Sequence, residues 1–153
     1  MWNLEVLAKR VLKLNENDAL KVVTQNKSIQ FNAIRLNRQV QLYQQGVDVD
    51  GKKMQSYKAQ GSNVYSNYTI RLKEEKGQVT DRVTMRDTGK LYSTFDTKVV
   101  KGELILMADT IKEGEDLQDS FGQFIGLDTE SKNELVVLAK PIVQQYVKGK
   151  IFQ

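Results

Sequence analysis

The 153-residue sequence contains neither cysteine nor histidine. The missing cysteines exclude disulfides and thiol nucleophiles, and the absence of both residue types excludes the usual structural zinc sites. The side chain that most often moves protons near neutral pH is also missing. Carboxylates, lysines and hydroxyls remain, but we predict a non-enzymatic protein with no catalytic, cofactor-binding or metal-binding residues.

Long apolar runs are also missing. No run approaches the roughly 18 residues of a membrane span, and the N-terminus lacks the features of a signal peptide. With 40% hydrophobic and 27% charged residues, we expect a soluble chain that has no membrane partner and stays in the compartment where it is made. The length predicts a single domain, 1–153, with a helical N-terminal arm (about 1–45) and an extended loop (about 46–69).

The net charge is +4, and it is unevenly distributed. Residues 1–60 carry ten Lys or Arg against five Asp or Glu, whereas residues 61–153 carry thirteen against fourteen. A basic excess of this size attracts nucleic acid or an acidic protein surface, and it is also typical of ordinary solubilising charge.

The first 45 residues have helical periodicity. Apolar residues spaced by three and four predict a short helix over 3–14, and Asp18 is a suitable cap for a longer helix that runs to Gln45 and ends at Gly46. After a first gap of seven residues, alternating steps of four and three predict a coiled-coil-like seam along the longer helix, made of Val22, Ile29, Ala33, Leu36, Val40 and Tyr43. Phe31, Ile34 and Leu42 lie off the seam, so we expect apolar contacts on more than one side.

The polar part of this longer helix is basic and rich in amides. It has no acidic residue between Asp18 and Asp48, and nine Gln or Asn between Gln25 and Gln45. The pattern predicts either a surface that meets other chains or a phosphate backbone, or a solvated helix face. The candidate basic surface consists of Lys21, Lys27, Arg35 and Arg38.

Residues 46–69 have glycines at 46, 51 and 61 and no clear period, which predicts a loop. Asp48, Asp50 and Gly51 resemble the start of a calcium-binding loop, but Ala59 stands where the bidentate glutamate is expected. We therefore interpret the segment as a turn. Its tyrosines are candidates for base stacking or, as we favour, for anchoring the loop.

Period-two alternation predicts a strand over 79–86, and Lys101-Gly102 predicts a hairpin turn before a strand from Leu104 to Ala108. Asp128 is a suitable cap for a final helix from about Thr129, with an apolar stripe of Leu135, Leu138 or Ala139, Ile142 and Tyr146. Pro141 predicts a kink or restart. The fold class is α+β: a long N-terminal helix, a small curved antiparallel sheet and a C-terminal helix kinked at a proline.

One motif is specific enough to suggest a family. The run D-T-G-K-L-Y-S-T-F supplies Asp87, Thr88, Gly89, Leu91, Thr94 and Phe95. Physically, the Asp and Thr side chains are suited to bonding nearby backbone amides, Gly89 to a left-handed bend, and Leu91 and Phe95 to the core. The run resembles the D-T-G-x-L-x-x-S signature of tail-completion and virion-morphogenesis proteins of tailed bacteriophages. F-I-G-L at 124–127 also resembles the element before that family's final helix. Thr94 replaces the motif's serine, and the arginine expected shortly before Phe124 is missing.

The resemblance implies a non-enzymatic structural protein of the virion, made in the bacterial host cytoplasm. It would form a homo-oligomeric ring at the neck or head-tail junction during virion assembly, as a connector or tail-completion protein. Partners would be further copies and other neck, portal or tail proteins, with passive contact with DNA. We predict oligomer or partner contacts at Ile29, Leu36, Val40, Tyr43, Phe121 and Phe124, with acidic residues from Asp109 to Asp119 as a complementary surface.

Two other functional classes remain open from the residues. One is a small basic nucleic-acid-binding module that uses the four basic side chains named above, with strongly salt-dependent affinity. The other is a homodimeric aspartic hydrolase, because Asp-Thr-Gly also marks the catalytic aspartate of that class, which needs two such carboxylates.

Overall fold

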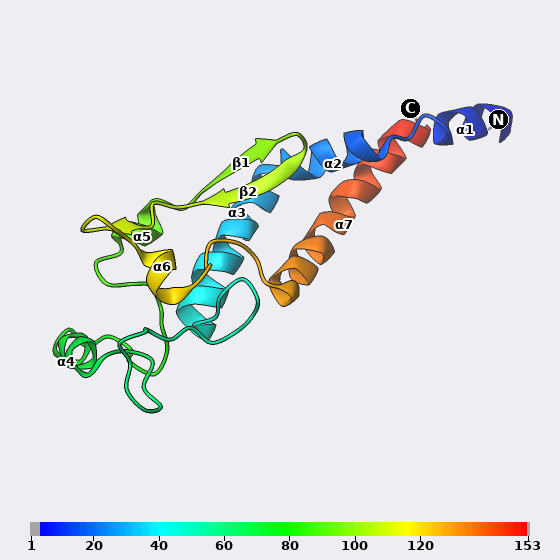
Figure 1. Ribbon diagram of the computed structural model, residues 1–153. Helices are drawn as coiled ribbons and strands as arrows, with labels where there is room; N and C mark the ends of the chain where they lie inside the picture. Colours follow the sequence, from blue (N-terminus) through cyan, green and yellow to red (C-terminus); the bar gives the residue numbers. More distant parts are fainter. Residues whose placement is uncertain (1–3, 153) are drawn as a thin grey trace.

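Helices dominate the computed structural model, which describes residues 4–152. The helices are α1 Leu4–Val11, α2 Glu16–Thr24, α3 Lys27–Arg35, η1 Leu36–Gln45, α4 Asn67–Glu75, α5 Lys90–Ser93, α6 Leu117–Phe121 and α7 Thr129–Phe152. The strands β1 Asp96–Val100 and β2 Glu103–Met107 form one antiparallel pair, and β3 Ile111–Lys112 and β4 Glu115–Asp116 form another. The predicted α+β class is confirmed. The molecule is elongated, with α1 and the end of α7 at one extremity and α4 at the other (Figure 1).

The predicted helix from Asp18 to Gln45 is interrupted at residues 25–26. Asn15, rather than Asp18, caps α2, because its side chain accepts a hydrogen bond from the Asn17 N–H. The Asn26 side chain accepts from the N–H groups of Ser28 and Ile29 and so starts α3. Asparagine competes with the helix by bonding its own following backbone. Helical spacing alone therefore predicted the wrong start for this helix and missed the break at residues 25–26.

The helix of α3 continues into η1 with a wider, π-helical turn. It ends as predicted at Gly46, whose φ of 67° is left-handed. A side chain is also excluded there by packing, since a Cβ on Gly46 would lie 2.8 Å from the Arg82 Cβ. Arg82 Nε donates to the Tyr43 carbonyl over 2.8 Å, which ties the end of η1 to the segment that precedes the D-T-G motif.

The buried core collects around η1. Its members come from η1, the 46–66 loop, the 83–95 region and the segment before α7. They are Leu42, Met54, Tyr65, Val83, Tyr92, Phe95 and Phe124. Burial of each large apolar side chain contributes about 1.5–3 kcal/mol. The core therefore joins segments that are far apart in sequence.

The predicted strand over 79–86 is absent. Its consecutive residues Val83 and Thr84 are both buried, and Met85 has a φ of 53°, which breaks the alternation of a strand. Tyrosine side chains bond this backbone instead: the Tyr65 hydroxyl accepts from the Thr84 N–H over 3.1 Å, and the Tyr92 hydroxyl donates to the Thr84 carbonyl. Periodicity does not reveal that two distant phenols replace a neighbouring strand.

The β1–β2 hairpin turns at Lys101-Gly102 as predicted, and Thr97 and Val99 pair with Leu106 and Leu104 on its half-buried face. The hairpin lies over α2 and α3 (Figure 1).

The final helix begins where predicted. The Asp128 carboxylate accepts from the Ser131 N–H over 2.8 Å and caps α7. The helix continues through Pro141, and the predicted kink stays a prediction. Leu135, Ala139, Ile142 and Tyr146 are half-buried, so Ala139 rather than the exposed Leu138 completes the stripe.

The helices α1, α2 and α7 extend beyond the core. α7 contacts α1, α2 and α3, and α1 is fixed by Arg10, whose Nη1 donates to the Ile151 carbonyl over 2.9 Å. We call residues 4–27 and 136–152 the terminal arm, and residues 28–135 the body. Most of the longer predicted helix, residues 28–45, therefore belongs to the body.

Candidate functional site

The D-T-G motif forms the turn before α5. Gly89 takes a left-handed conformation, with φ 87°, at the start of that helix. The Thr88 hydroxyl accepts from the Lys90 N–H over 3.3 Å, as the sequence predicted for a side chain at this turn. Phe95 is buried in the core, and Leu91 packs against it half-buried. The motif therefore shapes a bend and supplies core residues.

Asp87 has a different role from the one predicted. Its side chain does not bond backbone amides: Oδ1 lies 2.6 Å from Lys76 Nζ and Oδ2 lies 3.5 Å from Lys112 Nζ. The hydrogen bond from Lys76, with the positive charge of Lys112, holds the pKa of the Asp87 carboxyl below its usual value. The two lysines thus give Asp87 an ion-pair clasp that joins the end of α4 to β3.

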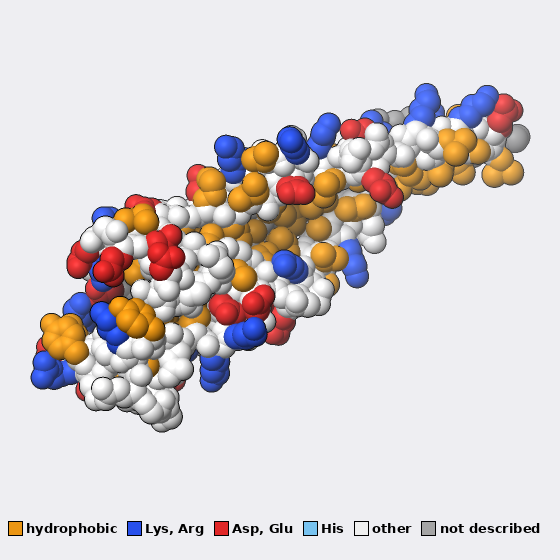
Figure 2. Space-filling view, in the orientation of Figure 1, with side chains coloured by type: hydrophobic (Ala, Val, Ile, Leu, Met, Phe, Trp, Pro, Cys, Tyr) orange, Lys and Arg blue, Asp and Glu red, His pale blue; other side chains and the backbone are white. Residues whose placement is uncertain are grey.

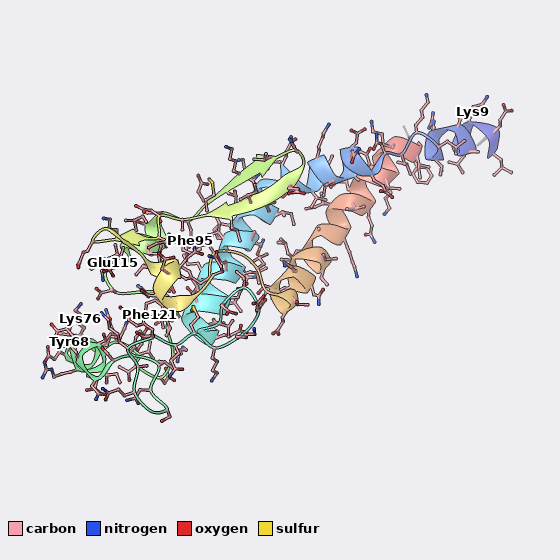
Figure 3. The ribbon with its side chains drawn as sticks, in the orientation of Figure 1. Lys9, Tyr68, Lys76, Phe95, Glu115 and Phe121 are labelled. Atoms are coloured by element: carbon pink, nitrogen blue, oxygen red, sulfur yellow. The ribbon has the colours of Figure 1, made fainter. Side chains whose placement is uncertain are left out.

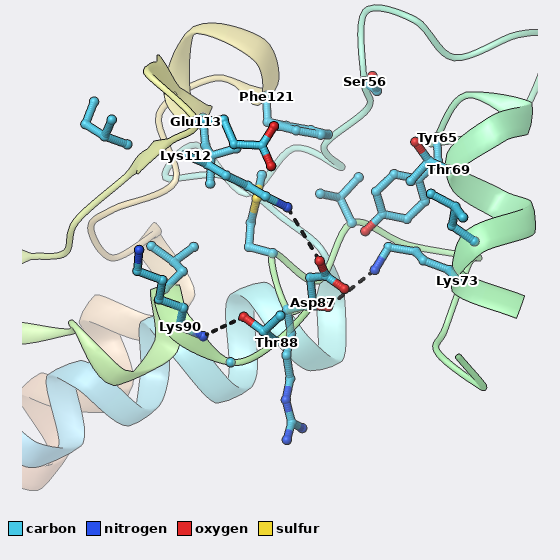
Figure 4. Close-up of a pocket in the computed structure, with 18 of the residues that line it drawn as sticks. Ser56, Tyr65, Thr69, Lys73, Asp87, Thr88, Lys90, Lys112, Glu113 and Phe121 are labelled. Atoms are coloured by element: carbon cyan, nitrogen blue, oxygen red, sulfur yellow. Dashed lines mark hydrogen bonds and ion pairs between the residues drawn. The ribbon is translucent and has the colours of Figure 1, made fainter. Parts of the chain in front are cut away.

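A cleft of about 540 Å³ lies beside this clasp. Figure 4 shows Asp87 between α4 and the segment that carries Lys112 and Glu113, with Phe121 and Tyr65 on the cleft walls. Leu72, Val83, Leu91 and Leu117 also contribute to its lining. The lining of the cleft combines apolar side chains with charged ones.

Lys73 is the most buried cation at this cleft, with 9% of its surface exposed. Burial lowers the pKa of its amine. The ammonium donates to Gln78 Oε1 and to the Arg86 carbonyl, each over 3.3 Å, and lies 5.0 Å from the centre of the Tyr65 ring. These contacts stabilise the ammonium within the fold. Lys73 therefore holds α4 against residues 78–86.

The amide-rich helix holds the segment before α7. Asn37 and Gln41 are fully buried. Asn37 Nδ2 donates to the Phe124 carbonyl over 2.9 Å, and its Oδ1 accepts from the Gly126 N–H over 3.2 Å. Gln41 Nε2 donates to the Gly126 carbonyl and its Oε1 accepts from the Asp128 N–H, each over 3.1 Å. We call these four bonds the amide clamp. Spacing did not predict that these two amides face inward.

The four predicted basic side chains do not form one open surface. Arg35 Nη2 pairs with Glu134 Oε1 over 2.8 Å, and Arg38 Nη1 donates to the Tyr92 carbonyl over 2.9 Å. Lys21 and Lys27 are exposed on α2 and α3. Two of the four cations thus make contacts within the chain, and the use of these four residues as a basic surface stays a prediction.

The predicted partner contacts also divide. Ile29, Leu36 and Phe124 are 2%, 0% and 0% exposed, so they are buried within their own chain, which corrects their assignment as partner contacts. Val40, Tyr43 and Phe121 are half-buried, and their contact with a partner stays a prediction.

Other apolar side chains are exposed on the terminal arm. Leu4 and Leu12 are 81% and 83% exposed, and Val136 and Val137 are also open to solvent. Figure 2 shows hydrophobic side chains along the underside of α1 and between the hairpin and α7. The sequence indicated an amphipathic α1, but it did not show which of its residues remain uncovered.

The loop tyrosines differ in their placement. Tyr65 anchors the loop in the core, as we favoured, whereas Tyr57 and Tyr68 are exposed. Asp48 Oδ1 accepts from the N–H groups of Asp50 and Lys52, which confirms a turn there.

Within residues 4–152, no cluster of carboxylates is suited to hold a metal ion, and no helix is both long and apolar enough to cross a bilayer. The chain matches no family model, and no curated protein or solved structure is significantly similar to it.

Proposed function

We propose that this protein is a non-enzymatic structural subunit that self-associates through its terminal arm, as part of a ring at the neck or head-tail junction of a tailed bacteriophage. The observation that carries the proposal is the set of exposed large apolar side chains on the terminal arm, including Leu4, Leu12, Val136 and Val137. Apolar surface gathered in this way marks a protein-interaction site, whereas isolated exposed hydrophobic residues need no explanation.

The sparse packing of α1 and α7 favours assembly with another chain. α1 has no buried residue of its own, and in α7 only Ser131 is buried among the described side chains. Most helical stability in proteins comes from packing of an apolar face rather than from propensity. A second chain packed on the terminal arm would supply the missing packing.

The resemblance of residues 87–95 to the phage signature supports the choice of a virion protein. The motif's left-handed glycine and buried aromatic residue give it a structural role at the centre of the body. No step of substrate chemistry is needed to account for Asp87, Lys73 or the cleft beside them.

The test is the mass of the purified full-length chain across a wide concentration range, by light scattering after size separation. For a ring subunit, the measured mass should rise from that of the 17.5 kDa monomer to a fixed multiple of it. Electron microscopy would then show annular particles. The ring should form without duplex DNA, even at low salt. A chain that stays monomeric and binds DNA with a steep salt dependence would replace this proposal with the nucleic-acid-binding module.

A further inference from the structure

We infer that the partner of the terminal arm is a second copy of this chain, and that α1 of one copy docks on residues 109–119 of the next. We call residues 109–119 the acidic segment. This inference rests on the proposed function and specifies its interface. It follows from charge, from exposed apolar side chains and from the position of the two surfaces on the molecule.

The two surfaces have opposite charge. The terminal arm carries eight Lys or Arg and three Asp or Glu, whereas the acidic segment carries five Asp or Glu and one Lys. On the acidic segment, Asp109, Glu113, Glu115 and Asp119 are exposed. On α1 and the turn that follows it, Lys9 and Lys13 are exposed four residues apart, and Lys9 Nζ also lies 2.8 Å from Glu5 Oε1 on the same helix. Such complementary charges steer association and disfavour other orientations.

Apolar side chains stand beside the charges on both surfaces. Leu12 lies in the turn that follows α1, three residues after Lys9, and its N–H still donates to the Ala8 carbonyl over 3.0 Å. The helical spacing therefore places it near Lys9. Ile111, which is 54% exposed, precedes Glu113 and lines the cleft described above together with Leu117 and Phe121. An arm leucine docked here would be covered by apolar walls while its neighbouring lysines meet carboxylates.

The two surfaces lie on opposite parts of the molecule. In Figure 3, Lys9 marks one extremity, and Glu115 and Phe121 lie on the opposite part of the molecule. The Arg10 bond to the Ile151 carbonyl fixes α1 to the end of α7, away from the acidic segment. In this arrangement α1 docks on another copy rather than on its own acidic segment.

A contact between two different surfaces of identical chains is heterologous. Such contacts produce a ring when the rotation between subunits closes, and a filament when it does not. The arrangement differs from a two-fold dimer of arms, in which the same patch would meet itself and the acidic segment would have no part.

The experiment exchanges the charges. The arm variant carries Lys9→Glu and Lys13→Glu, and the body variant carries Glu113→Lys and Glu115→Lys. Each variant alone places like charges opposite one another, so the concentration for half-assembly should rise roughly tenfold or more. A matched control, Lys52→Glu with Lys53→Glu, makes the same charge change as the arm variant outside both surfaces and should assemble like the unaltered chain.

An equimolar mixture of the arm and body variants decides the matter. In the mixture every acidic arm meets a basic body and every basic arm meets an acidic body, so assembly should return in alternating copies. This recovery would also show that both variants are folded. A mixture that remains as weak as its components, or single variants that assemble normally, would overturn the pairing while leaving self-association intact. An unaltered chain that stays monomeric at every concentration would overturn both the pairing and the proposed function.

Discussion

The body and the terminal arm of this protein are both largely helical, but they differ in how far their side chains are buried and hydrogen-bonded within the chain. In the body, Phe124 is fully buried and the amide clamp bonds the backbone on either side of Gly126. In the terminal arm, Leu4 and Leu12 remain over four-fifths exposed. The core of the body is closed within one chain, whereas the large apolar side chains of the arm lie open to solvent. Stability should therefore depend on the core of the body, and association on the arm together with the acidic segment that we propose it docks on.

The sharpest way to break this contrast is to remove a core side chain. Phe124→Ala should lower the free energy of unfolding by about 3–5 kcal/mol, because it leaves a cavity where η1 meets the segment before α7. Denaturant titration monitored by circular dichroism measures the loss. The matched control is Phe31→Ala, at a side chain that is 64% exposed, and it should change stability by less than about 0.5 kcal/mol. Equal losses at the two positions would contradict the distinction between core and surface phenylalanines.

The second change tests the amide clamp. Asn37→Ala should destabilise the fold by about 1–3 kcal/mol, because the buried Phe124 carbonyl and Gly126 N–H lose their partner. The same titration measures it, and hydrogen exchange should show faster exchange at residues 124–128. Gln39→Ala, at an exposed amide on the same helix, is the control. If the two variants were equally stable, the clamp would contribute nothing.

The third change tests whether an exposed apolar side chain of the arm serves self-association. Leu12→Ser should leave the unfolding of the dilute monomer within about 0.5 kcal/mol of the unaltered chain. It should weaken self-association by roughly tenfold, since burial of a leucine contributes about 1.5–3 kcal/mol. Light scattering across concentration measures the shift. A variant that melts early but assembles normally would place Leu12 in the fold rather than at an interface.

The smallest expected effect belongs to the Asp87 clasp. The folded-state pKa of Asp87 lies below its ordinary value of 3.8, so its ion pairs stabilise the fold above the unfolded pKa and are lost as the pH falls through the folded value. Because the side chain is 38% exposed, the contribution should be below about 1 kcal/mol. Asp87→Asn should flatten the fall in unfolding free energy below about pH 4. A variant whose stability falls as steeply as that of the unaltered chain would show that Asp87 is not responsible.

Some of this organisation was readable from the sequence, where local chemistry decides the structure. The Lys101-Gly102 turn, the Asp128 cap and the left-handed Gly46 and Gly89 all depend on a few neighbouring residues. The break at Asn26 was missed because apolar spacing continues across it, although the asparagine itself is a capping signal. The strand expected over 79–86 was wrong because the hydroxyls of Tyr65 and Tyr92, from elsewhere in the chain, bond the backbone at Thr84.

The candidate site was predictable to a smaller extent. The D-T-G bend and its glycine were expected, but the pairing of Asp87 with Lys76 and Lys112 depends on the folding of α4 and β3 against each other. The sequence showed that this helix is rich in amides, but it did not show which of them are buried. Asn37 and Gln41 point inward, while Gln39 and Gln44 are exposed. Which apolar residues of α1 remain uncovered depends on how α7 packs, and periodicity carries no information on that.

Hydrogen exchange of the unaltered chain at low and at high protein concentration tests the central claim most directly. If the arm is completed by a second copy, backbone amides of α1 and of the acidic segment will exchange more slowly in the concentrated sample, while those around Phe124 will exchange at the same rate in both. Equal exchange of α1 and the acidic segment at both concentrations, in a sample whose mass has increased, would contradict the account because assembly would then use another surface.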